Sequence, residues 1–128
     1  MQLSIRLLDD VGSVNRLQAV TELNLSGSPG PLDIYFQFID RQADPSDAAC
    51  RYVPNTGATT RLMFRHANDA KVMDKVASQP FAGDGSIWKV SLLAIESALL
   101  SGTVNLSFQL TEGTSVRSGQ AFAALRVL

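Results

Sequence analysis

The sequence is poor in the residues from which active sites are built. Of its 128 residues, one is a cysteine (Cys50), one is a histidine (His66) and one is a tryptophan. A single cysteine excludes a disulfide within the chain, and a lone thiol is typical of a protein made in a reducing cytoplasm. One histidine and one cysteine supply too few ligands for a zinc site. We therefore expect neither a disulfide framework nor a metal centre.

The chain also lacks a charge excess and long apolar runs. Eight arginines and three lysines against twelve acidic residues give a net charge of −1, which provides no bulk attraction to nucleic acid or anionic lipid. No stretch approaches the roughly 20 apolar residues of a membrane span, and the start, MQLSIRLLDD, has no signal-peptide pattern. We therefore expect no nucleic-acid partner and no membrane partner.

What is present is the composition of one globular domain. A length of 128 residues is usual for a single domain, so we expect one unit over residues 1–128. Hydrophobic residues make up 45% and charged residues only 18%, against an average of about 25% charged. This composition leaves spare apolar surface for contact with neighbours. The cations are mostly arginine, which is the cation favoured at protein interfaces.

Apolar and polar residues alternate along most of the chain, with the period of a strand that has one wet face. The pattern is sharpest in PLDIYFQFID at 31–40, where the inward positions are Leu32, Ile34, Phe36 and Phe38. Similar stretches predict strands at 2–8, 19–25, 59–65, 86–93, 103–111 and 121–127. KVMDKVAS at 71–78 fits either a short strand or a helical turn.

Turn-forming segments separate these strands. SGSPGP at 26–31 cannot be helical, and DRQADPSDAACRYVPNTG at 40–57 is a long polar connection with two prolines. AIESALLSG at 94–102 predicts one short helical turn that ends at Gly102. About seven or eight short strands, spaced by about 8–12 residues, predict an all-β fold, an antiparallel β-sandwich.

No motif in the sequence predicts catalysis. His66 is interpreted as a solvated histidine in a turn, and the carboxylates Asp44 and Asp47 as ordinary turn residues in a Pro/Ser loop. FAGDG at 81–85 lacks the lysine and the following helix of a phosphate loop. We therefore expect no enzyme, no catalytic residue, no cofactor and no metal. Trp88 is interpreted as a core aromatic, since Val90 and Leu92 share its face.

Two segments carry a resemblance to a known class of proteins. LNLSGSPGPLDIYFQFID at 23–40 and SIWKVSLLAIESALLSGTVNLSFQLTEGTSVRSGQAFAALRVL at 86–128 resemble small structural proteins of tailed bacteriophages, including capsid decoration and cement proteins. The closing hairpin is similar to the Ig-like N-terminal domains of phage baseplate upper proteins. Val104 stands where those domains have a tyrosine, and the sequence stops at Leu128 without their fibre-linked region.

The resemblance implies an Ig-like, non-catalytic virion protein that is made in the host cytoplasm. Its partners would be other phage structural subunits, capsid or tail, in a homo-oligomer or multi-copy assembly. Capsid cement or decoration is the first placement, and a tail or baseplate component the second. A further alternative is a carbohydrate-binding module for host attachment through Tyr35, Tyr52 or Trp88.

The residues expected to contact partners lie mainly in the long loop at 40–57. We predict Arg41, Arg51 and Tyr52 in this loop and Tyr35 on the neighbouring strand as contact residues. The exposed edges of the first and last strands are a second candidate, because an unpaired edge is a template for another chain.

Overall fold

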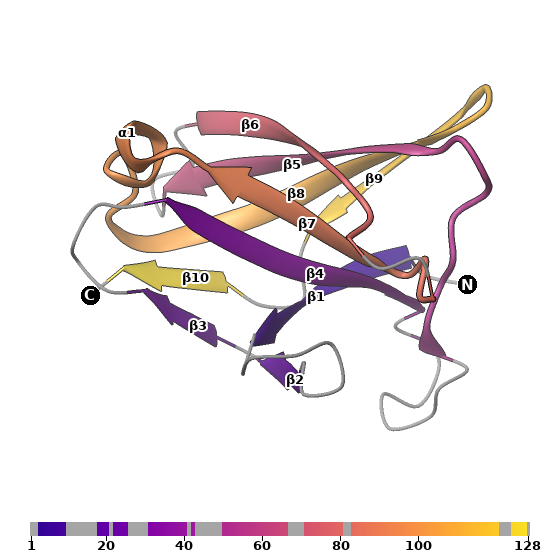
Figure 1. Cartoon of the computed structure of the whole chain (residues 1–128), viewed down its shortest axis with the longest axis horizontal. Coiled ribbons are helices and arrows are strands. Elements are labelled where there is room, and N and C mark those ends of the chain that lie inside the picture. The colour runs from indigo at the N-terminus through magenta and orange to yellow at the C-terminus, as the bar shows by residue number, and fades with distance from the viewer. Residues whose placement is uncertain are drawn as a thin grey trace.

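In a computed structural model, the chain forms two β-sheets packed face to face (Figure 1). The structure describes residues 3–9, 18–20, 22–25, 31–40, 42, 50–66, 71–80, 83–120 and 124–127. The first sheet has the order β2-β1-β4-β7, formed by Gln18–Val20, Leu3–Asp9, Leu32–Asp40 and Ile87–Leu92. All of its neighbouring strands are antiparallel.

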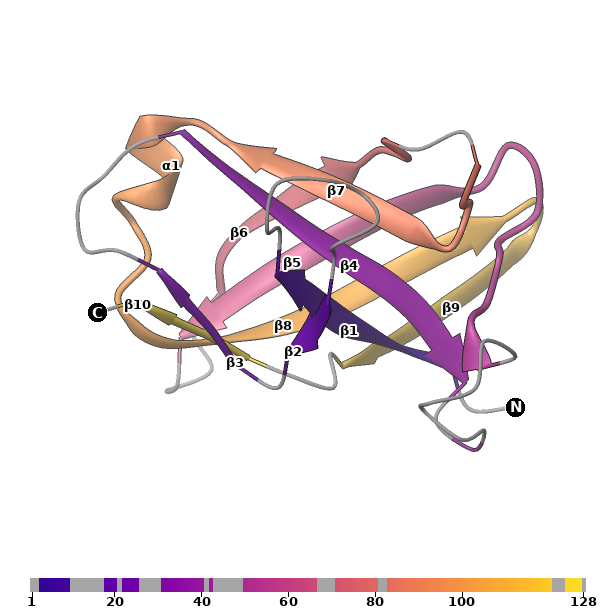
Figure 2. The same cartoon turned by 60° about the horizontal axis from the view of Figure 1, so that its bottom comes forward.

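The second sheet is larger and lies behind the first (Figure 2). Its order is β3-β10-β8-β5-β6, formed by Glu22–Leu25, Ala124–Val127, Gly102–Glu112, Thr59–His66 and Lys71–Ala77. The strand β9, Ser115–Gln120, pairs with the second half of β8, and one pair, β3 with β10, is parallel. Together with a single short helix α1, Ala94–Ser97, this arrangement confirms the predicted all-β sandwich.

Two details of the strand prediction are corrected or resolved. The stretch at 19–25, predicted as one strand, contributes β2 to one sheet and β3 to the other, so the chain changes sheets within it. The ambiguous segment 71–78 is a strand, β6, because its residues pair in register with β5.

The prediction that the terminal strands provide exposed edges was wrong for β10 and for the second half of β1. β1 lies between β2 and β4, and β10 lies between β3 and β8. Leu125, for example, is opposite Val104 on one side and Leu23 on the other. β10 and the Leu7–Asp9 half of β1 are therefore interior to their sheets, whereas in the described residues Leu3–Arg6 pairs with β4 alone.

An aromatic cluster joins the two sheets at the centre of the core. The Phe38 ring makes edge-to-face contacts with Phe36, Trp88 and Phe108, at centroid distances of 5.9, 6.1 and 5.4 Å. All three phenylalanines are fully buried and Trp88 is 3% exposed, which confirms Trp88 as a core residue. Such pairs add about 0.5–1.5 kcal/mol each beyond the burial of their area, so the cluster stabilises the sandwich from both layers.

Gly119 lies directly against this cluster. It is opposite Phe108 in the β8–β9 pair, and a Cβ atom at Gly119 would lie 2.9 and 3.0 Å from two atoms of the Phe108 ring. The ring is held on its other side by Phe38 at 5.4 Å, so it has little room to move away. Glycine is required here because the two strands approach closely over an aromatic ring.

Gly119→Ala is therefore expected to destabilise the fold by about 1–3 kcal/mol, the usual effect of overpacking a core. Gly83→Ala is the control, since a Cβ atom there would meet nothing within 4 Å. Urea unfolding measures both. Equal stability of the two variants would contradict the close packing at Gly119.

Candidate functional site

The end of the long loop is fastened to the first sheet. The backbone of Arg51 forms an isolated antiparallel β-bridge with that of Ile39, and the N–H of Tyr52 donates to the carbonyl oxygen of Phe38 at 3.0 Å. These contacts place two of the predicted contact residues, Arg51 and Tyr52, beside the end of β4. The third residue predicted in this loop, Arg41, lies outside the described residues.

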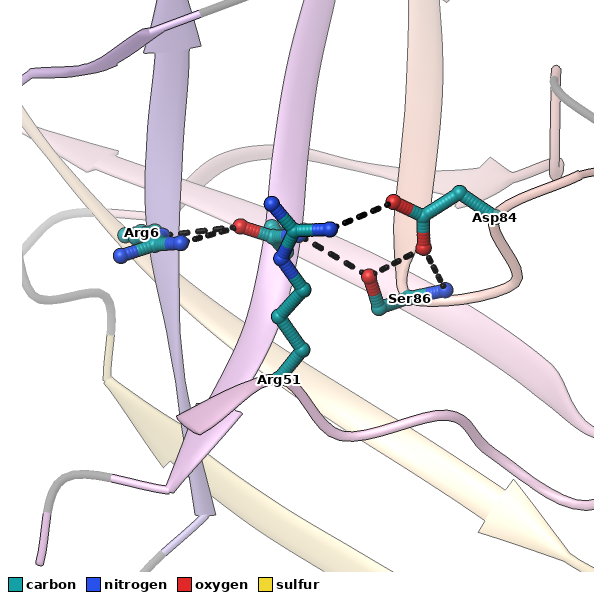
Figure 3. Close-up of polar contacts among 5 residues, drawn as sticks. Arg6, Arg51, Asp84 and Ser86 are labelled. Atoms are coloured by element: carbon teal, nitrogen blue, oxygen red, sulfur yellow. Dashed lines mark hydrogen bonds and ion pairs between the residues drawn. The ribbon is translucent and has the colours of Figure 1, made fainter. Parts of the chain in front are cut away.

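A chain of polar contacts crosses the outer face of the first sheet (Figure 3). The Arg6 guanidinium donates to Oε1 of Gln37 at 2.9 and 2.6 Å, and Nε2 of Gln37 donates to Oγ of Ser86 at 3.0 Å. The Ser86 hydroxyl in turn donates to Oδ1 of Asp84 at 2.5 Å. The other Asp84 oxygen lies 3.5 Å from Nη1 of Arg51.

The two ends of this polar network differ in burial. Gln37 is 3% exposed and Ser86 is fully buried, so their hydrogen bonds satisfy groups that water cannot reach. The Arg51 side chain is about half exposed, and surface ion pairs of this kind contribute little. The buried Gln37 and Ser86 therefore hold β4 and the start of β7 together. Arg51, at the exposed end of the network, remains accessible at the surface.

We expect Ser86→Ala to lower the free energy of unfolding by about 1–3 kcal/mol, because it leaves the buried Gln37 amide without this acceptor. Arg51→Ala should lower it by less than about 1 kcal/mol. Chemical denaturation of both variants measures the difference. A larger loss for Arg51→Ala would show that the rim ion pair, and not the buried part, holds the network together.

A second polar cluster closes the sandwich near the β8–β9 turn. The Tyr52 hydroxyl donates to both oxygens of Glu112, at 2.8 and 2.9 Å, and the N–H of Asn55 donates to Oε2 at 2.9 Å. Nε of Arg117 lies 4.0 Å from Oε1 of Glu112, and the guanidinium lies over the Tyr52 ring at 5.6 Å. Glu112 is thus a buried carboxylate surrounded by donors.

These contacts shift the pKa values of Glu112 and Tyr52 in opposite directions. The Asn55 N–H, followed by the Tyr52 hydroxyl and Arg117, holds the pKa of Glu112 below its ordinary value, against the opposing effect of burial. Burial, followed by the hydrogen bond to Glu112, raises the pKa of Tyr52. At neutral pH the carboxylate is charged and the phenol is neutral, so the pair is a structural contact and does not exchange protons readily.

Of the remaining candidates for chemistry, Asp44 and Asp47 lie outside the described residues. His66 is not a solvated turn residue as predicted: it ends β5, opposite Val104, and its Nε2 is buried without a hydrogen-bond partner. Among the described residues, no three histidine, cysteine, aspartate or glutamate side chains gather as metal ligands would. The described part of the chain therefore offers no cluster of the usual metal ligands.

The three aromatic residues of the carbohydrate alternative do not share a surface. Trp88 lies inside the core, and Tyr52 packs against the core from its rim. Tyr35 alternates with the buried Ile34 and Phe36, so it faces outward from β4. A stacking platform that combines Trp88 with either tyrosine is excluded by this arrangement.

A feature that the sequence analysis missed lies around α1. None of the α1 residues is buried, and Leu93, Ile95 and Leu99 are 64%, 75% and 55% exposed. We call these three side chains the α1 cap. The only charged residue between 90 and 103 is Glu96, and its carboxylate already accepts from the Leu93 N–H and from Lys75. The cap is therefore a group of exposed apolar side chains at one end of the sandwich, beside the Lys75–Glu96 ion pair.

Sequence comparison does not identify the chain. No family model matches it, and no curated protein matches it in sequence. A solved structure, that of AggA, the major subunit of aggregative adherence fimbriae type I from Escherichia coli, matches over 98% of this chain and 92% of its own length. The identity is 12% and the TM-score 0.34, and so low a score supports no inference about function. No helix in the described residues is long and apolar enough to cross a membrane.

The Glu112 cluster predicts a specific pH dependence. Because the pKa of Glu112 is lower in the folded than in the unfolded state, its stabilisation is complete above the ordinary glutamate value and is lost as the pH falls through the folded value. Glu112→Gln should lower the free energy of unfolding by about 1–3 kcal/mol at neutral pH. Urea titrations at several pH values should show this difference shrinking on acidification. A difference that is constant with pH would contradict a charged Glu112.

Proposed function

We propose that the protein is a non-catalytic structural protein of a tailed-phage virion, which docks on other virion subunits as capsid cement or decoration. The observation that carries the docking role is the α1 cap. Large apolar side chains exposed close together on a surface mark interaction sites. The resemblance of the 23–40 and 86–128 segments to phage structural proteins supports the choice of partner.

The size of the cap fits an anchor better than a complete interface. Each Å² of apolar surface removed from water contributes about 25 cal/mol, whereas a stable interface of its own requires about 1,000 Å² or more. Three side chains supply only part of that area. They would instead enter an apolar socket on a larger partner, as the central residues of an interface do.

The polar network on the first sheet supplies a second contact of different chemistry. Arg51 is held at the rim by Asp84 but keeps half of its side chain exposed. Arginine pairs with carboxylates and with backbone carbonyls at interface rims. A partner that covers this face would meet a positioned cation, while the buried part of the network keeps the sheet beneath it rigid.

Binding to purified particles tests the proposal. The protein should co-sediment with heads that have been stripped of tails, and a variant with Leu93→Ser, Ile95→Ser and Leu99→Ser should lose most of that binding. Val76→Ser is the matched control, since Val76 is 64% exposed but lies on β6 outside the cap. Circular dichroism should show both variants folded, because none of these side chains is buried.

The other outcomes are equally clear. Binding to isolated tails and not to heads would place the protein in the tail or baseplate, where the same cap would be used. Binding to glycans that is lost with Tyr52→Ala would favour host attachment. Failure to bind either particle, or equal binding by the cap variant, would remove the proposal.

A further inference from the structure

In the described residues the second sheet has open edges at β3, β6 and β9, and β6 and β9 each carry a cation that points toward the core. β6 pairs with β5 on one side, and on its other side the described residues supply only the bridge between Ser78 and Lys89. Among the described strands, β9 pairs with β8 alone. An open edge of this kind presents unpaired backbone groups to any strand that approaches.

The register shows where the two cations point. Lys75 is opposite Leu62 in the β5–β6 pair, and Arg117 is opposite Leu110 in the β8–β9 pair. Residues directly opposite in an antiparallel pair share a face of the sheet, and both leucines are fully buried. Lys75 and Arg117 therefore emerge on the core side of their strands, where an apolar residue would ordinarily be found.

Each cation is balanced by a carboxylate from another element. Nζ of Lys75 lies 2.8 and 3.0 Å from the two oxygens of Glu96 in α1, and both side chains are about a quarter exposed. Arg117 lies 4.0 Å from Glu112. Lys75, Glu96 and Arg117 are thus partly exposed to water, whereas Glu112 is buried.

The backbone of β6 is suitably oriented for pairing with another strand. The N–H and C=O of Ser78 both bond to Lys89, at 2.9 and 2.7 Å, so they point away from β5. Because these directions alternate along a strand, the backbone groups of Val76 and Asp74 point the same way, toward the open edge. A second β6 strand, arriving antiparallel, would find these groups free of a partner strand.

We propose that the β6 edge is a latent pairing surface for the β6 strand of a second copy, and that Lys75 with Glu96 keeps it closed. Pairing would bring Lys75 of both copies together and would remove the Lys75–Glu96 pair from water, which is costly for charged groups. The Arg117–Glu112 pair would disfavour strand pairing at the β9 edge for the same reason. This inference concerns the sheet edges and does not depend on the proposed docking through the α1 cap.

Replacement of the inward-facing charge tests the proposal. Lys75→Val removes it and introduces a residue favoured in strands. Lys71→Val is the matched control, because it makes the same change in the same strand, but Lys71 pairs with Asp74 on the outward face. We expect Lys75→Val to reach the mass of a dimer or larger species in light scattering as its concentration rises. Lys71→Val should keep the mass of the wild type at each concentration.

Hydrogen exchange distinguishes strand pairing from other association. The amides of Asp74 and Val76 should exchange more slowly in associated Lys75→Val than in the wild type or in Lys71→Val. A wild-type mass together with unchanged exchange at these amides would overturn the proposal, as would the same association by Lys71→Val. If Lys75→Val does not fold, Lys75→Gln, which retains a donor for Glu96 but no charge, decides by the same two measurements.

Discussion

The fold depends on the burial of one face of β4. Phe36 and Phe38 project from this face into the centre of the core, where Phe38 contacts aromatic rings from β7 and β8. Side chains alternate along a strand, so this burial also determines that Tyr35 and Gln37 face outward. The register with β1 and β7 then brings Arg6 beside Gln37. The polar network on the outer face is thus a consequence of how the core is packed.

A sandwich of two sheets leaves open sides, and this protein closes two of them with ion pairs. The same acid that holds Lys75 at one edge also accepts from the Leu93 N–H and so fixes the first turn of α1. At the other edge, Glu112 holds both Arg117 and the end of the long loop through Tyr52. Each carboxylate therefore performs two tasks, which links the stability of the edges to the position of the adjoining loop or helix.

The sequence predicted those features that depend on neighbouring residues along the chain. Period-two alternation located the strands and most of the core, because burial on one face leaves that signature directly. It could not assign 19–25 to two sheets, since strand pairing is decided between distant segments. The contact between Tyr52 and Glu112 spans 60 residues and has no local signal. The run LLAIESALL did signal the α1 cap, but apolar residues in a helical turn are as consistent with burial as with exposure.

The distribution of charge and apolar surface separates two modes of association. Along β6 and β9 of the second sheet, where another strand could add, the chain places inward-facing cations. At α1, the Glu96 carboxylate is already bonded and the apolar side chains are exposed. Backbone pairing is indifferent to sequence, whereas insertion of side chains into a socket is selective. The inward-facing cations therefore disfavour strand addition at β6 and β9, whereas the exposed side chains at α1 favour insertion into a partner.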